Sequence, residues 1–144
     1  MKSIWLNLPV KDIQKSKKFF KAIGFRENPM YSKVEHFASF FIGENDFVMM
    51  LFPEDTFKSF SHNEVPSTLK GTEALFSIDA QDKTEVDEMA EKVSKAGGEI
   101  FAEPAERDGW MYGFGFTDMD GHRWNMLYMD PPAERAGMEK MPEQ

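Results

Sequence analysis

The hydrophobic and polar positions of the first half of the chain predict a strand, a helix and three further strands. Residues 3–10 alternate as a half-buried strand does. In residues 13–23 the apolar side chains recur every three or four positions, and Asp12 and Gly24 supply the N-cap and the stop of an amphipathic helix. The strands predicted after this helix are residues 25–30, 34–43 and 47–52.

The second half repeats this order of elements. Residues 73–79 predict a strand, and a helix with an apolar stripe follows, which begins at Asp82 or Thr84 and ends at Gly97. A short strand at residues 99–102 and two longer strands complete the half. Each half therefore has the order strand, helix, strand, strand, strand.

The two longer strands form a predicted β-hairpin, residues 109–130, with the sequence GWMYGFGFTDMDGHRWNMLYMD. Its turn is Asp120-Gly121, because this dipeptide readily adopts the positive φ angles of a tight turn. Two glycines between aromatic residues in the first arm allow another group to approach the sheet closely. In the second arm Asn125 stands among apolar neighbours, where an amide needs a partner or a cavity.

A polar segment, residues 53–71, separates the two halves. It contains two prolines, and Phe57 and Phe60 lie about one helical turn apart. We interpret it as a connector with a short helix, which serves either as a linker with two packing aromatics or as a flap over a pocket.

The repeated pattern predicts a single α+β domain of two paired units. The domain spans residues 1–131, with module one at 1–53, the connector at 54–71 and module two at 72–131. Since each unit carries its helix on one face of its strands, two paired units leave the other faces free to curve around a cavity. The polar tail, residues 132–144, is predicted to be mobile.

Composition narrows the classes of function. The chain has 144 residues and no cysteine, which excludes thiol nucleophiles, thiolate metal sites and disulfides, and it suits a cytoplasmic protein. Seventeen basic residues stand against 25 acidic ones, so the net charge of −8 argues against nucleic-acid binding and favours a neutral or cationic ligand. We expect neither a signal peptide nor a membrane span.

Three segments carry a resemblance to a known family: LPVKDIQKSKKFFKAIGF, FSIDAQD and YGFGFTDMDGHRWNML. They resemble the vicinal oxygen chelate superfamily, which includes glyoxalases, fosfomycin and bleomycin resistance proteins and extradiol dioxygenases. Within it, the chain is most similar to small bacterial proteins described as predicted lactoylglutathione lyases. The resemblance implies two paired βαβββ modules, an open U-shaped sheet of eight mixed strands with helices on its outer face, and a homodimer.

The resemblance also implies where metal-using relatives place their ligands, on the first and last strand of each module. The corresponding residues are Trp5, Met49 or Met50, Glu73 and Asn125. Glu73 alone is a strong ligand for a divalent ion, because tryptophan has no free lone pair and thioether and amide groups bind such ions weakly. We therefore expect no cofactor, with a divalent metal as the less favoured alternative.

The three histidines do not restore a metal site, because His36, His62 and His122 share no short ligand spacing. The alternation of side chains along an extended strand puts Arg123 and Asn125 on one face. The predicted ligand-binding residues are Trp5, Asn7, Met49, Glu73, Trp110, Tyr112, Phe114, Arg123 and Asn125. The aromatic residues at positions 110 to 116 have an alternative role as core beneath the helices.

Two functions from different classes agree with these observations. The first is metal-independent binding or sequestration of a small molecule, similar to the bleomycin resistance branch, by stacking on aromatic walls. The second is a glyoxalase-like lyase or isomerase, metal-dependent through a non-standard site or metal-free with Glu73 as the base. Under the family alignment Glu73 points into an aromatic pocket beside Trp5, where desolvation would raise its pKa.

Overall fold

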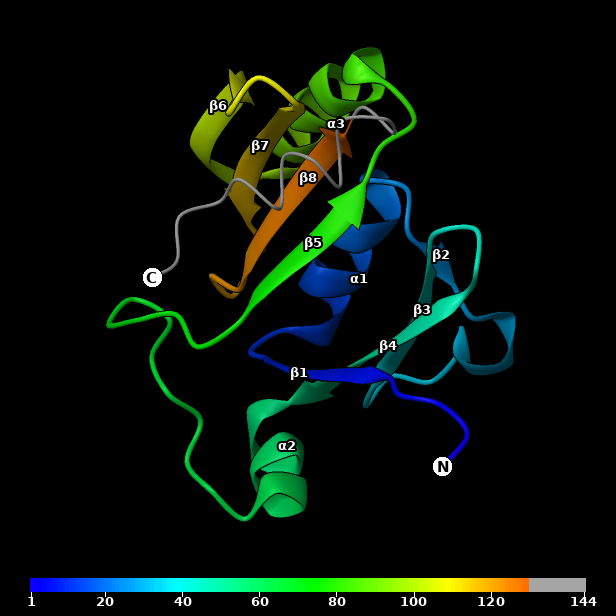
Figure 1. Ribbon diagram of the computed structural model, residues 1–144. Helices are drawn as coiled ribbons and strands as arrows, with labels where there is room; N and C mark the ends of the chain where they lie inside the picture. Colours follow the sequence, from blue (N-terminus) through cyan, green and yellow to red (C-terminus); the bar gives the residue numbers. More distant parts are fainter. Residues whose placement is uncertain (130–144) are drawn as a thin grey trace.

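The computed structural model describes residues 1–129 and has the predicted order of elements (Figure 1). The first module consists of β1 (Leu6–Val10), α1 (Ile13–Ala22), β2 (Arg26–Glu27), the short 3₁₀ helix η1 (Pro29–Tyr31), β3 (Ala38–Ile42) and β4 (Phe47–Pro53). The connector contains α2 (Glu54–Ser61). The second module consists of β5 (Leu75–Asp79), α3 (Lys83–Ala96), β6 (Glu99–Arg107), β7 (Met111–Thr117) and β8 (Arg123–Met129). The predicted tail, residues 132–144, lies outside the described residues.

The eight strands are hydrogen-bonded as two mixed sheets of four. Sheet A has the order β1-β4-β3-β2, and sheet B has the order β5-β8-β7-β6. In each sheet the first strand pairs in parallel with the last strand of its module, and the other pairs are antiparallel. The predicted α+β class with two paired βαβββ modules is confirmed, and within residues 1–129 no strand pair joins the two sheets.

Both long helices have the predicted caps. The Asp12 carboxylate accepts a hydrogen bond from the Lys15 backbone nitrogen at 3.0 Å, and Gly24 follows α1 with a φ of 102°. Of the two residues proposed to cap α3, Asp82 holds the position and accepts from the Glu85 nitrogen at 2.8 Å. These contacts satisfy backbone donors that each first helical turn leaves unpaired.

Helix α1 lies in the angle between the two sheets (Figure 1). Its Phe20 ring is 6.0 Å from Phe40 of sheet A and 5.8 Å from Trp124 of sheet B. We call the side of each sheet that faces α1 and α3 its helix face, and the opposite side its open face. Because both helix faces pack around α1, the two open faces point away from each other.

Five predicted strands have different limits in the structure, and two of them, predicted at residues 3–10 and 34–43, are shortened to Leu6–Val10 and Ala38–Ile42. Residues 25–30 form a strand only at Arg26–Glu27, since the Asn28 side chain accepts from the Met30 nitrogen and begins η1. The strand predicted from residue 73 begins at Leu75. The strand predicted at 99–102 extends to Arg107 and has two shifts in its pairing with β7.

The turn between β7 and β8 joins the two modules to each other and to the connector. The Asp120 carboxylate accepts from the Lys11 backbone nitrogen at 2.8 Å and from the Ser16 hydroxyl at 3.2 Å. The Thr68 hydroxyl donates to the Asp120 carbonyl at 2.7 Å, and the His122 ring nitrogen donates to the Pro9 carbonyl at 2.8 Å. The Asp120-Gly121 turn of the hairpin therefore has a structural role, which is to connect the two modules and the connector.

Asp118 organises this turn from within. Its carboxylate accepts from the Trp124 indole nitrogen at 3.1 Å and from the backbone nitrogens of Asp120 and His122 at 3.0 and 3.1 Å. Burial raises the pKa of Asp118, and the charge of His122 and these hydrogen bonds oppose that shift. A buried carboxylate with three donors fixes the path of the chain between the two strands.

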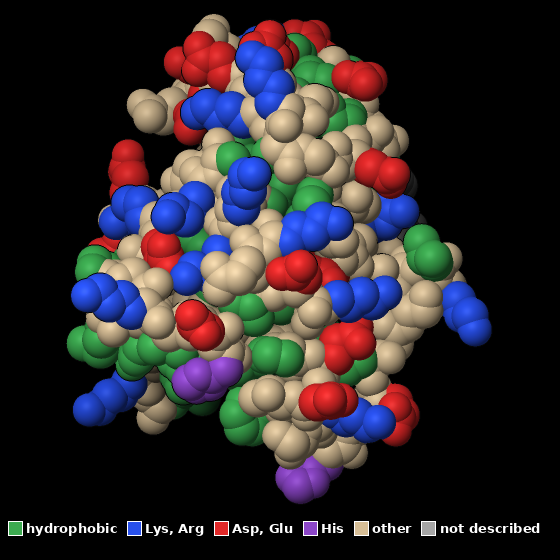
Figure 2. Space-filling view, turned by 180° about the vertical axis from the view of Figure 1, so that it is seen from behind, with side chains coloured by type: hydrophobic (Ala, Val, Ile, Leu, Met, Phe, Trp, Pro, Cys, Tyr) green, Lys and Arg blue, Asp and Glu red, His purple; other side chains and the backbone are tan. Residues whose placement is uncertain are grey.

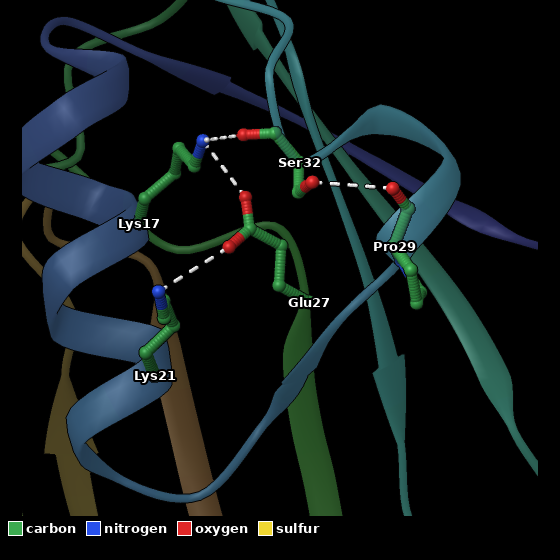
Figure 3. Close-up of polar contacts among 5 residues, drawn as sticks. All are labelled: Lys17, Lys21, Glu27, Pro29 and Ser32. Carbon is green, nitrogen blue, oxygen red and sulfur yellow. Dashed lines mark hydrogen bonds and ion pairs between the residues drawn. The ribbon is translucent and has the colours of Figure 1, made fainter.

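Lysine side chains of α1 hold β2 and the segment after it against the helix (Figure 3). The Lys17 amine lies 2.8 Å from the Glu27 carboxylate and donates to the Ser32 carbonyl at 3.1 Å, and the Lys21 amine approaches Glu27 at 3.4 Å. Lys17 is buried, and the Glu27 side chain is 13% exposed. A polar hollow of about 640 Å³ borders Lys17, whose amine is already paired with Glu27.

Replacing Glu27 with glutamine should lower the free energy of unfolding by about 1–2 kcal/mol at pH 7. Burial alone raises the pKa of Glu27, but the hydrogen bonds and charges of Lys17 and Lys21 outweigh it and hold the pKa below its usual value. The contribution is thus present above the unfolded-state pKa and is lost as the pH falls through the folded-state pKa. Urea unfolding at pH 7 and at about pH 3 should show the difference between variant and wild type shrinking in acid.

The control for this experiment is Glu64→Gln. Glu64 pairs with Lys58 at a similar distance, 2.8 Å, but its side chain is 81% exposed, so its loss should leave unfolding unchanged. Equal effects of the two substitutions would contradict the role assigned to the Glu27 pair.

No helix within residues 1–129 is long and apolar enough to cross a membrane; the longest, α3, has 14 residues.

On the face shown in Figure 2, lysine and arginine side chains alternate with acidic ones and do not form a continuous basic surface.

Candidate functional site

The open face of sheet B carries a buried amide group without a partner. Asn125 lies on β8 between Ser77 of β5 and Gly115 of β7, which are its neighbours in register. Its side-chain oxygen is buried and accepts no hydrogen bond from any described residue. An unpaired buried carbonyl costs free energy, so this oxygen is a candidate acceptor for a ligand.

An aromatic ring from the neighbouring strand lies beside this amide. The pairing of β6 with β7 shifts between Ile100 and Ala102, so Phe101 is the extra residue of a β-bulge. Its ring lies over Gly115, in the space that a Cβ atom would occupy. The Arg123 guanidinium lies over the same ring, 4.5 Å from its centroid, in a cation–π contact.

Phe101 is the residue of this candidate site that the sequence interpretation missed. The glycines of β7 had indicated a close approach to the sheet, and Gly115 is where this approach occurs. The sequence carries no sign of the bulge that turns Phe101 toward it. Arg123 and Asn125, by contrast, lie on one face as their spacing predicted.

The open face of sheet A is lined by a row of aromatic rings. Asn7, Met50 and Ser39 are neighbours in register across β1, β4 and β3, and the Ser39 hydroxyl is buried without a partner among the described residues. Adjacent rings in the row have centroids 5.2 to 6.0 Å apart. The row consists of Tyr31, Phe37, Phe52 and Phe60.

Three predicted ligand-binding residues lie on the helix faces, and the prediction that they line a cavity is wrong. Met49 and Phe114 belong to the core, packed beneath the helices. The Tyr112 hydroxyl donates to the Asp87 carboxylate on α3 at 2.6 Å. Met50, the alternative to Met49, occupies the open face.

The alternative interpretation of the aromatic stripe, core beneath the helices, is confirmed for the strand residues. Phe116, the neighbour of Phe114 in the stripe, is also fully buried. Trp110 lies in the turn before β7 and is half-buried. The aromatic wall on an open face comes instead from the first module.

Glu73 and Trp5 do not share a desolvated pocket. Glu73 precedes β5 and is exposed, and Trp5 precedes β1 and is 55% exposed. The prediction that the Glu73 carboxylate is desolvated in an aromatic pocket is therefore wrong. The strand that was expected to carry Glu73 into that pocket begins two residues later, at Leu75. His36 and His62 are exposed, as expected.

Comparison with protein families gives a match over residues 2–126 to the glyoxalase/bleomycin resistance protein/dioxygenase superfamily. The chain belongs to this superfamily. Comparison with curated proteins gave no match.

Solved structures of the superfamily fold share this architecture. Hypothetical protein SA1046 from S. aureus is 32% identical, with a TM-score of 0.79 over 89% of this chain and 94% of that one. A family enzyme from Burkholderia phytofirmans PsJN is 16% identical, with a TM-score of 0.73 over 88% and 97%. The fosfomycin resistance protein FosX from Listeria monocytogenes, in complex with Mn(II) and sulfate, is 21% identical, with a TM-score of 0.68 over 94% and 98%.

The residues at the superfamily's metal-ligand positions do not fit a divalent ion in this chain. Trp5, Met50 and Asn125 offer an indole, a thioether and an amide, which are poor ligands for such ions. The carboxylate at the fourth position, Glu73, is exposed ahead of its strand. Within residues 1–129 no three histidine, aspartate or glutamate side chains come together as a metal-binding group.

Proposed function

We propose that the protein binds a small planar molecule with an N–H donor on the open face of sheet B, without a resident metal. The observation that carries the proposal is the buried Asn125 oxygen beside Phe101 and Arg123, which has no hydrogen-bond partner within residues 1–129. A ligand N–H would donate to this oxygen, and a flat ring would stack against Phe101 as the guanidinium does now. A neutral aromatic ligand agrees with the preference that the net charge suggests.

We prefer the hypothesis of small-molecule binding to that of a lyase or isomerase, because an enzyme of that kind needs a group that transfers protons. Glu73 is the base that the enzyme hypothesis requires, and its side chain is exposed to solvent ahead of β5. Asn125 does not titrate and serves as a hydrogen-bonding group alone. Sequestration of a metabolite or drug needs hydrogen-bonding and stacking groups and no proton-transferring group.

A homodimer is part of the proposal. The open faces of sheets A and B lie on opposite sides of α1, so one chain cannot close a cavity between them. A second copy that lays its sheet A over sheet B would cover Asn125. The row of rings from Tyr31 to Phe60 would then form the opposite wall.

Indole and benzofuran test the proposal, because they have the same shape and differ in the N–H donor. The wild type should bind indole about five- to tenfold more tightly than benzofuran in calorimetric titrations, as one hydrogen bond of about 1 kcal/mol implies. In Asn125→Leu, which removes the acceptor at similar volume, the two affinities should become equal. Asn45→Leu, in the exposed turn between β3 and β4, is the matched control and should keep the preference.

A preference for indole that survives in Asn125→Leu would contradict the assigned acceptor. Elemental analysis of the dialysed protein tests the second half of the proposal. A stoichiometric divalent metal would contradict metal-independent binding.

A further inference from the structure

A second concave surface lies between the edges of the two modules. The groove has a volume of about 910 Å³ and is bordered by residues of β1 and β5, the edge strands of the two sheets (Figure 1). Phe76, Trp124 and Met126 contribute apolar lining from the helix face of sheet B. Neither Phe101 nor Asn125 lines it, so the groove is separate from the open-face site. Its volume is within the usual range of small-molecule sites.

Exposed apolar side chains gather at this groove. Ile4, Trp5, Phe47 and Leu75 all line it and are between 42% and 80% exposed. Single exposed apolar side chains are ordinary, but several around one concavity mark a binding surface. The groove therefore offers apolar contacts that the described chain leaves unused.

The charges of the groove have one sign. Among the described residues, its charged lining side chains are Glu44, Asp79 and Glu85, and none of its lining residues is a lysine or an arginine. Two copies docked groove to groove would bring three carboxylates from each chain together, and the net charge of −8 adds to this repulsion. A cationic occupant, by contrast, complements both the carboxylates and the π faces of Trp5 and Phe47.

We propose that the groove between the modules binds a small apolar cation, a class that includes quaternary ammonium and phosphonium ions with aromatic or bulky alkyl groups. The apolar walls exclude water around the alkyl or aryl groups, and the carboxylates at the rim neutralise the charge. A cation delocalised or buried within apolar groups suits this arrangement better than a compact hydrated ion such as ammonium.

Tetraphenylphosphonium and tetraphenylborate test the inference, because they have nearly the same shape and opposite charges. Titrations that follow tryptophan fluorescence should show the phosphonium binding at least tenfold more tightly than the borate. Leu75→Lys, which places a cation on the rim, should weaken phosphonium binding at least tenfold. Leu69→Lys is the matched control, because Leu69 is 96% exposed and does not line the groove, and it should bind as the wild type does.

The carboxylates are tested by the double variant Glu44→Gln with Asp79→Asn. Its phosphonium affinity should fall roughly three- to tenfold, and the affinity of the wild type should fall with added salt. Asn125→Leu should leave phosphonium binding unchanged, which separates this site from the open-face site. Light scattering should give the same mass for the wild type and for Leu75→Lys.

Equal binding of the two ions would overturn the inference, as would unchanged phosphonium binding in Leu75→Lys. A dimer that dissociates in Leu75→Lys would also overturn it, because the groove would then be a contact between copies of this chain.

Discussion

Trp124→Ala should lower the free energy of unfolding by about 3–5 kcal/mol, because it removes the largest fully buried side chain of the described residues. The Trp124 side chain is 1% exposed, and its ring centroid lies within 6.2 Å of four phenylalanine rings. These rings come from α1, from the segment after it, and from two strands of sheet B: Phe20, Phe25, Phe76 and Phe116. Removal of the indole would leave a cavity at the contact between the two modules.

Thermal unfolding measures this effect, with a fall of roughly 10–20 °C expected for a domain of this size. Trp5→Ala is the control, because Trp5 is largely exposed and its loss should shift the transition little. Similar shifts for the two variants would show that the modules do not depend on Trp124.

Asp118→Ala should lower the free energy of unfolding by about 2–4 kcal/mol. The Asp118 carboxylate accepts from the Trp124 indole nitrogen and from two backbone nitrogens, and its removal leaves these buried donors unpaired. Asp118→Asn should lower the free energy of unfolding by less than Asp118→Ala does. It should still be less stable than the wild type, because the amide nitrogen of asparagine would face one of the three hydrogen-bond donors. The order wild type, asparagine, alanine should appear in urea midpoints.

The control for the Asp118 variants is Asp79→Asn, because the Asp79 carboxylate is exposed at the end of β5. Its midpoint should match the wild type. If Asp118→Asn were as stable as the wild type, the carboxylate would not organise the turn as its contacts indicate. The hydrogen bonds that connect this turn to the first module would then come from Asp120 and His122, without a contribution from Asp118.

The open-face site could be predicted in part. Strand alternation correctly put Arg123 and Asn125 on one face, and the glycines of β7 indicated a close approach. Phe101 could not be predicted, because a β-bulge is a local change of pairing between two strands and leaves no periodic signal.

The aromatic stripe of β7 shows a second limit. Alternation states that Tyr112, Phe114 and Phe116 share a face, but the same pattern fits a cavity wall and a core. The helices decide between them, since α1 and α3 pack on that side and bury Phe114 and Phe116. The row of rings on sheet A was missed for the opposite reason, because its four members come from the 3₁₀ helix η1, a loop, a strand and helix α2.

Residue types at short spacing were enough to predict the two βαβββ modules and their helix caps, and the resemblance to the superfamily implied the poor set of metal ligands. Only the packing of the modules established which face of each sheet is covered, where Phe101 lies and how the β7–β8 turn joins the two halves. Asp120 bonds Lys11 from 109 positions away, and His122 bonds Pro9 from 113. Contacts of this range form when the modules pack together, and no local pattern encodes them.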